Sequence, residues 1–182
     1  MSELYSLFVK VKISKDQLHK FKSSRPVAPA LNSSWTNWWD SREMYDKHAL
    51  QVVQSYHADS YGQIIQEIID EKFSGSQDLY DPHSGTWYFY VLQFSENYQE
   101  IIPMMAMLKD LAHYLEPEAT GHAFLYDYMW ESKEVMFEIT YQNKEAKLTS
   151  AARTGQLPSE IVTEANQILD DWSTELQKRY ED

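Results

Sequence analysis

Runs of apolar residues and alternations of apolar with polar residues predict the strands of this chain. Residues 4–13 place their apolar side chains mainly on one face, a pattern typical of a half-buried strand. Residues 86–94 are apolar on both faces and rich in aromatic and β-branched side chains, which favours a central strand. Residues 122–130 and 135–141 alternate and are separated by four polar residues. These two runs predict an antiparallel hairpin.

Apolar residues three and four positions apart predict the helices. Ser60 and Gln63 form a capping-box pattern before one apolar stripe. Pro103 fits a helix only in its first turn, so the next helix is expected to start near Ile102. The expected helices cover about residues 14–22, 41–54, 60–74, 102–115 and 157–176.

These elements indicate one α+β domain spanning residues 1–182. We expect a mostly antiparallel sheet of four or five strands, with the helices packed chiefly on one side. No stretch approaches the roughly 18 apolar residues that a membrane helix needs, so no membrane contact is expected. The chain has no Cys, and its first residues lack the pattern of a secretion signal. We therefore expect a cytoplasmic protein.

The negative charge of the chain is unevenly distributed. The formal net charge is −12, yet residues 1–42 hold seven Lys/Arg against three Asp/Glu, a net +4. Residues 43–182 hold nine Lys/Arg against twenty-five Asp/Glu, a net −16. Such a charge repels nucleic acid and anionic membranes and speeds association with a basic protein. It also serves solubility alone, so charge by itself does not decide the function.

Signatures of catalysis are weak in this sequence. The five glycines are isolated, no Cys is present, and no Ser stands in a Gly-x-Ser-x-Gly setting, so we expect no bound cofactor and no covalent catalysis. Asp78, Asp81 and His83 form an Asp-x-x-Asp-x-His string whose side chains suit a divalent metal ion. A metal-assisted hydrolase is therefore one alternative. The same string with Pro82 is also typical of an ordinary turn, and we expect neither a metal ion nor an enzyme.

Three tryptophans form the first candidate binding feature. Trp35, Trp38 and Trp39 lie at i, i+3 and i+4, so a helical turn would project all three indoles to one side. They would either pin this segment onto the core or anchor a partner beside Asp40.

The hairpin supplies a second candidate feature. Asp127 lies on the face opposite the aromatic side chains of residues 124–130. If that face is open, Asp127 with Glu131, Glu134 and Glu138 would form an acidic platform for a basic protein. The expected partner-binding residues are Trp35, Trp38, Trp39, Asp40, Asp78, Asp81, Asp127, Glu131 and Glu134.

The whole chain resembles a class of bacterial proteins in four respects. It is small, it is acidic after Arg42, it has no Cys, and it contains two aromatic segments, Ser34-Trp-Thr-Asn-Trp-Trp-Asp and Thr86-Trp-Tyr-Phe-Tyr. It resembles the immunity proteins of contact-dependent growth inhibition and related polymorphic toxin systems. The resemblance implies a cytosolic protein without catalysis that binds its cognate toxin tightly, most plausibly a nuclease. A further alternative is a nucleic-acid mimic, which would block many DNA-binding proteins instead of one partner.

Overall fold

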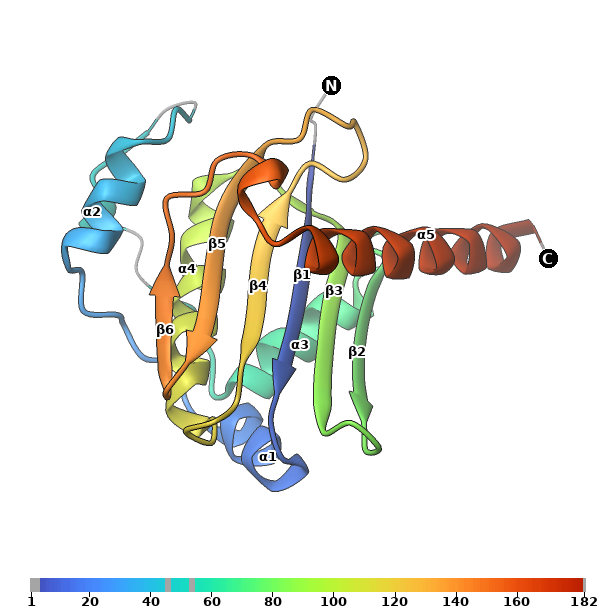
Figure 1. The fold of residues 1–182 in the computed structure, drawn as a ribbon, viewed down its shortest axis with the longest axis horizontal. Coiled ribbons are helices and arrows are strands. Elements are labelled where there is room, and N and C mark those ends of the chain that lie inside the picture. The colour runs from blue at the N-terminus through green and yellow to red at the C-terminus, as the bar shows by residue number, and fades with distance from the viewer. Residues whose placement is uncertain (1–3, 45–46, 53–54, 182) are drawn as a thin grey trace.

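A six-stranded antiparallel sheet runs through the computed structural model, which describes residues 4–44, 47–52 and 55–181 (Figure 1). The strand order is β2-β3-β1-β4-β5-β6, and every neighbouring pair is antiparallel. The strands are β1 Tyr5–Lys12, β2 Ser76–Asp81, β3 Thr86–Ser95, β4 Gly121–Tyr126, β5 Val135–Gln142 and β6 Glu145–Leu148. The chain therefore has an α+β fold.

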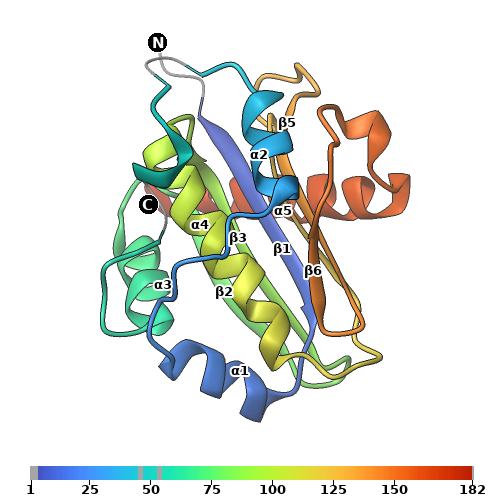
Figure 2. The ribbon, with the colours of Figure 1, turned by 90° about the vertical axis from the view of Figure 1, so that its left-hand side faces the viewer.

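Helices cover both faces of this sheet. Helices α1 to α4 lie on one face, and α5 crosses the opposite face (Figures 1 and 2). The helices are α1 Lys15–Ser23, α2 Ser33–Asp40, α3 Tyr61–Asp70, α4 Tyr98–Asp110 and α5 Ser159–Glu181, with short 3-10 turns η1 Leu50–Val52, η2 Leu111–Tyr114 and η3 Thr154–Gln156. No described helix combines the length and the apolar character needed to cross a membrane.

Strand β1 is buried on both of its faces, because each face meets a separate apolar cluster. Leu7, Val9 and Val11 join the cluster formed with α1 to α4. Phe8 joins the cluster beneath α5. The half-buried strand expected for residues 4–13 is therefore a central strand covered on both faces, although Lys12 at its end is exposed.

Side-chain caps start four of the five helices. Ser14 and Ser60 accept hydrogen bonds from the backbone N–H groups of Gln17 and Gln63, at 3.2 and 3.1 Å. Asn32 and Asn97 cap α2 and α4 in the same way. Each cap supplies an acceptor for an N–H that has no partner inside the helix. The cap predicted at Ser60 is thus confirmed, but the Gln63 side chain accepts from the Asp59 N–H at 3.1 Å and not from that of Ser60, so the capping box is incomplete. Helix α3 ends at Asp70 and not near residue 74.

The sheet has six strands where the sequence suggested four or five. The additional strands are β2 and β6, at the two edges of the sheet. Their sequences, SQDLYD and EAKL, are short and largely polar. Edge strands need little apolar surface, so they leave a weak alternation pattern.

Two helix boundaries also differ from expectation. No α-helix covers the described part of residues 41–54, where only Leu50–Val52 forms a 3-10 turn; positions 45–46 and 53–54 lie outside the described residues. Helix α4 begins at Tyr98, not near Ile102, so Pro103 lies inside the helix. The Asn97 cap and the burial of nine of the thirteen α4 residues offset the backbone hydrogen bond that Pro103 cannot donate.

Candidate partner-binding surface

The loop between β4 and β5, residues 127–134, is held in shape by the side chain of Asp127. Its Oδ1 accepts from the Trp130 N–H at 2.8 Å, and its Oδ2 accepts from the Ser132 N–H at 2.9 Å. Glu131 and Lys133 have φ angles of 58° and 65°, a left-handed conformation uncommon for residues other than glycine. The two bonds to Asp127 span Glu131 and so stabilise this unusual turn.

Hydrogen bonds with the C-terminal part of the chain also hold the 127–134 loop in its conformation. The Tyr128 hydroxyl donates to Asp170 on α5. Burial, together with the neighbouring Asp170 carboxylate, raises the pKa of Tyr128. The Thr154 N–H donates to the Lys133 carbonyl at 2.9 Å, and the Arg153 guanidinium donates to the Ser132 carbonyl at 3.3 Å. The loop is therefore preorganised.

This fixed loop exposes apolar side chains beside carboxylates. Trp130 is 51% exposed and Met129 is 42% exposed. Glu131 and Glu134 are exposed in the same loop. Trp and Met are enriched in the cores of protein interfaces, and a fixed aromatic side chain loses little entropy on binding.

An acidic pocket of about 530 Å³ adjoins the loop through Tyr5. The Tyr5 hydroxyl donates to Glu134 Oε2 at 2.8 Å, and Tyr5 also lines the pocket. The remaining described lining residues are Glu43, Met44, Glu96, Asn97, Tyr98, Gln99 and Met136. Both charged residues of this described lining are acidic, and both are exposed. We name the exposed carboxylates Glu43, Glu96, Glu131 and Glu134 the acidic rim.

Most cations near the acidic rim hold the backbone in place. Arg42 donates to the carbonyls of Met136 and Ala151 at 2.9 and 2.6 Å, and burial lowers its pKa. Lys47 donates to the Arg42 carbonyl at 2.9 Å. Lys133 is exposed on the loop itself and offsets part of the negative charge there. The surface around the acidic rim therefore carries both signs of charge, and its four exposed carboxylates outnumber the exposed ammonium group of Lys133.

The three candidate tryptophans lie in the core. Trp35, Trp38 and Trp39 are all buried, and the Trp38 indole N–H donates to the Met136 carbonyl at 2.8 Å. The i, i+3, i+4 spacing does place them on one side of α2, but that side faces the sheet. They pin α2 to the core and present no surface to a partner. Asp40, the last residue of α2, is exposed.

The Asp78, Asp81 and His83 string forms no metal site in the structure. Asp78 accepts from the Lys22 ammonium at 2.5 Å and from the Trp87 indole at 2.7 Å. Asp81 lies three residues further along β2, so its side chain points to the opposite face of the sheet. Across the part of the chain that the structure describes, no three His, Asp or Glu side chains gather to hold a metal ion.

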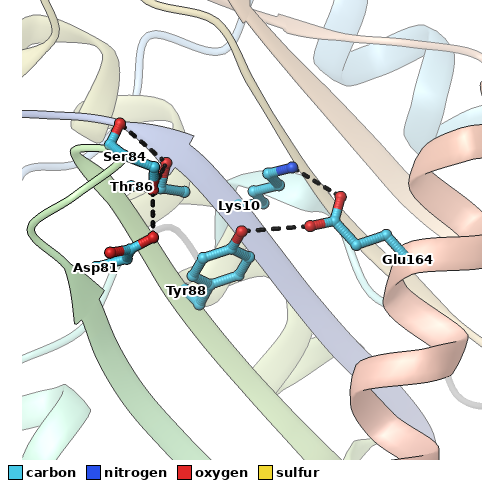
Figure 3. A network of polar contacts seen from close by, with 6 residues as sticks. All are labelled: Lys10, Asp81, Ser84, Thr86, Tyr88 and Glu164. Carbon is cyan, nitrogen blue, oxygen red and sulfur yellow. Dashed lines mark hydrogen bonds and ion pairs between the residues drawn. The ribbon is translucent and has the colours of Figure 1, made fainter.

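Asp81 belongs to a polar network on the face crossed by α5 (Figure 3). Its carboxylate accepts from the Ser84 hydroxyl at 2.6 Å and from the His83 N–H at 2.9 Å, which lowers the pKa of Asp81. In the same view Glu164 of α5 accepts from Lys10 at 2.7 Å and from Tyr88 at 3.3 Å. Asp78 and Asp81 thus serve the turn and the sheet, at a distance from the acidic rim.

The acidic platform expected on the hairpin is only partly present. Asp127 and Glu138 are 8% and 4% exposed, so neither contributes to a surface. The Thr149 hydroxyl donates to Glu138 Oε1 at 2.8 Å, and the Thr149 N–H donates to the Glu138 carbonyl. The segment that follows β6 therefore covers this position. Only Glu131 and Glu134 of the expected platform remain exposed.

Glu43, Glu96, Met129 and Trp130 were not among the expected partner-binding residues. Glu43 and Glu96 are isolated acids in the sequence, and only the register of β1 against β3 brings Glu96 near Tyr5. Trp130 belongs to the alternating run of residues 122–130, which suggested a strand. Strand β4 ends at Tyr126, so the last four residues of that run form the loop.

Replacing Asp127 with Ala is expected to lower the free energy of unfolding by about 1–3 kcal/mol, because the N–H groups of Trp130 and Ser132 lose their acceptor. Urea unfolding measures this loss. Asp127→Asn keeps one acceptor oxygen and should cost less. The control is Glu131→Gln, an exposed change in the same loop, which should stay within about 0.5 kcal/mol of the wild type. An unchanged stability for Asp127→Ala would contradict the assigned role.

No family model matches the chain, and neither the curated proteins nor the solved structures include one that is significantly similar to it.

Proposed function

We propose that this protein is a cytoplasmic immunity protein that binds and neutralises a basic toxin, with a nuclease domain as the leading candidate. The observation that carries the proposal is the acidic pocket beside the fixed loop, where Glu43 and Glu96 stand next to Tyr5 and Glu134. A Lys or Arg side chain of the partner would enter this pocket.

The geometry favours binding in two ways. Trp130 would act as an apolar anchor, because it is half exposed on a loop whose conformation is already fixed. The acidic rim would steer a basic partner toward that anchor and raise the association rate. Nucleases suit such a surface because their own active sites are positive where they contact phosphate.

The direct test first asks whether the gene immediately upstream encodes a large secreted protein, and then uses the C-terminal domain of that protein as the partner. The two proteins should co-purify at low salt and associate rapidly in stopped-flow measurements, with a rate that falls as salt is added. The double variant Glu131→Lys, Glu134→Lys should associate at least about tenfold more slowly and show a flatter salt dependence. Trp130→Ala should mainly accelerate dissociation.

Two matched variants control this experiment. Lys133→Glu changes charge in the opposite direction within the same loop and should speed association. Glu116→Lys with Glu118→Lys makes the same charge change as the test variant, in the exposed segment before β4 at the other end of the sheet, and should have a smaller effect. Equal slowing by both double variants would show that net charge, not the acidic rim, controls association. Failure to associate at low salt would refute the proposal for that domain, and similar binding to several unrelated DNA-binding proteins would favour a nucleic-acid mimic.

A further inference from the structure

A second pocket has a volume of about 450 Å³ and is lined partly by the segment joining α1 to α2 and by α4. Figure 2 shows this segment passing over α4. Small apolar side chains form much of its lining: Val27, Pro29, Ala106, Ala112 and Ala146. They come from that segment, from α4 and η2, and from β6. The volume falls in the range of small-molecule sites, which are typically apolar with a few polar groups.

Trp35 supplies an unused hydrogen-bond donor in the lining of this pocket. The residue is fully buried, and no described residue accepts a hydrogen bond from its indole N–H. A buried donor without an acceptor destabilises a fold, because its hydrogen bond to water is lost and not replaced. An acceptor brought by a ligand would remove that cost.

Lys109 places a positive charge beside the same indole. Its ammonium lies 6.0 Å from the centroid of the Trp35 ring, and none of the ion pairs formed among the described residues includes Lys109. Burial lowers the pKa of Lys109, as expected for a partly desolvated cation without a counterion. An anion in the pocket would neutralise this charge.

The acids of the lining do not supply that anion. Asp110 Oδ2 accepts from the Tyr61 hydroxyl at 2.9 Å, and Asp110 Oδ1 contacts His113 Nδ1 at 2.9 Å. Glu145 is exposed at the start of β6. The lining also includes Lys144, which is exposed next to Glu145. Lys109 is the partly buried cation beside the indole donor, and Asp110 and Glu145 would repel a second negative charge on a ligand, so a single negative charge suits the pocket best.

We propose that this pocket binds a small organic monocarboxylate with an apolar body. The carboxylate accepts from the Trp35 indole N–H and pairs with the Lys109 ammonium. The apolar body packs against Val27, Pro29 and the three alanines. Because the indole nitrogen is itself shielded from solvent, binding requires a small local movement of the groups that cover it.

The first test uses 3-phenylpropionate as the probe and its uncharged amide, 3-phenylpropionamide, as the comparison. The acid should shift the indole N–H resonance of Trp35 in a saturable, one-to-one manner at millimolar concentration or below. It should bind at least about tenfold more tightly than the amide, because hydrogen bonds to charged groups are the stronger ones. Binding should also raise the pKa of Lys109, followed by NMR of its side chain.

Two variants separate the two contacts. Trp35→Phe keeps an aromatic ring and removes the donor, and Lys109→Met keeps a chain of similar length and removes the charge. Each should weaken 3-phenylpropionate binding about tenfold. Lys109 is only partly buried, so Lys109→Met should fold even if Trp35→Phe is destabilised. The control is Lys147→Met, which removes the same charge from an exposed position on β6 outside the lining.

Three results would overturn the proposal. One is the absence of a saturable shift at millimolar probe. Another is unchanged affinity in folded Lys109→Met. The third is binding of inorganic phosphate as tight as that of the carboxylate, which would indicate a site for any anion and no role for the apolar lining. The proposed function predicts none of these measurements, so either proposal can fail alone.

Discussion

Replacing Trp87 with Ala is expected to lower the free energy of unfolding by about 3–5 kcal/mol. Trp87 is fully buried on β3. Its ring stacks on Phe89 with centroids 5.7 Å apart and meets Phe21 edge-on at 6.0 Å. Its indole N–H donates to Asp78 at 2.7 Å. The substitution therefore removes a large packed side chain and one of the hydrogen bonds that hold Asp78.

Chemical denaturation monitored by circular dichroism measures this loss. Trp87→Phe keeps an aromatic ring and removes the donor, so it should cost less than Trp87→Ala. The matched control is Trp130→Ala, which truncates the same side chain at a half-exposed position and should change stability far less. If the two alanine variants unfold at the same denaturant concentration, the assignment of Trp87 to the core is wrong.

Leu169→Asp should detach α5 from the sheet and cost about 4 kcal/mol or more. Leu169 is fully buried in the cluster that also contains Phe8, Tyr90 and Phe124. A carboxylate at this position would lie among apolar groups without a partner. Helix α5 is the long helix that covers this face of the sheet (Figure 1). Hydrogen exchange should report fast exchange along α5 and new exposure of the strands beneath it.

Thr163→Asp is the control for this experiment, because it adds the same charge to the same helix at an exposed position. Its effect on stability should stay within about 0.5 kcal/mol. Protection of the α5 amides in Leu169→Asp equal to that in the control would contradict the packing described here.

Sequence patterns predict best those elements whose pattern comes from a single local cause, such as burial on both faces or a capping side chain. Strand β3 is apolar on both faces because it is internal, and α1 starts at Lys15 because the Ser14 hydroxyl caps it. The burial of Phe8 in β1 depends on α5, which lies far away in the sequence. Local alternation carries no information about such a distant cover, so a half-buried strand was the natural expectation.

The candidate surface was predictable only in part for the same reason. Glu131 and Glu134 are exposed where the hairpin pattern placed them. The tryptophan spacing of α2 identified a common side, yet spacing does not say whether that side meets the core or the solvent. Glu43 and Glu96 come together only through the tertiary fold. Their grouping therefore required the structure.

The two outer strands of the sheet bear on aggregation. An outer strand offers unpaired backbone groups to any other chain that could extend the sheet, which is the first step toward fibres. Strand β2 carries Asp78 and Asp81, and β6 is only four residues long with Glu145 and Lys147 exposed. Lys22 compensates the charge of Asp78, so a second copy added edge to edge at β2 would chiefly bring the Asp81 carboxylates of the two copies together. The negative charge of this chain therefore also opposes fibre growth at the β2 edge of the sheet.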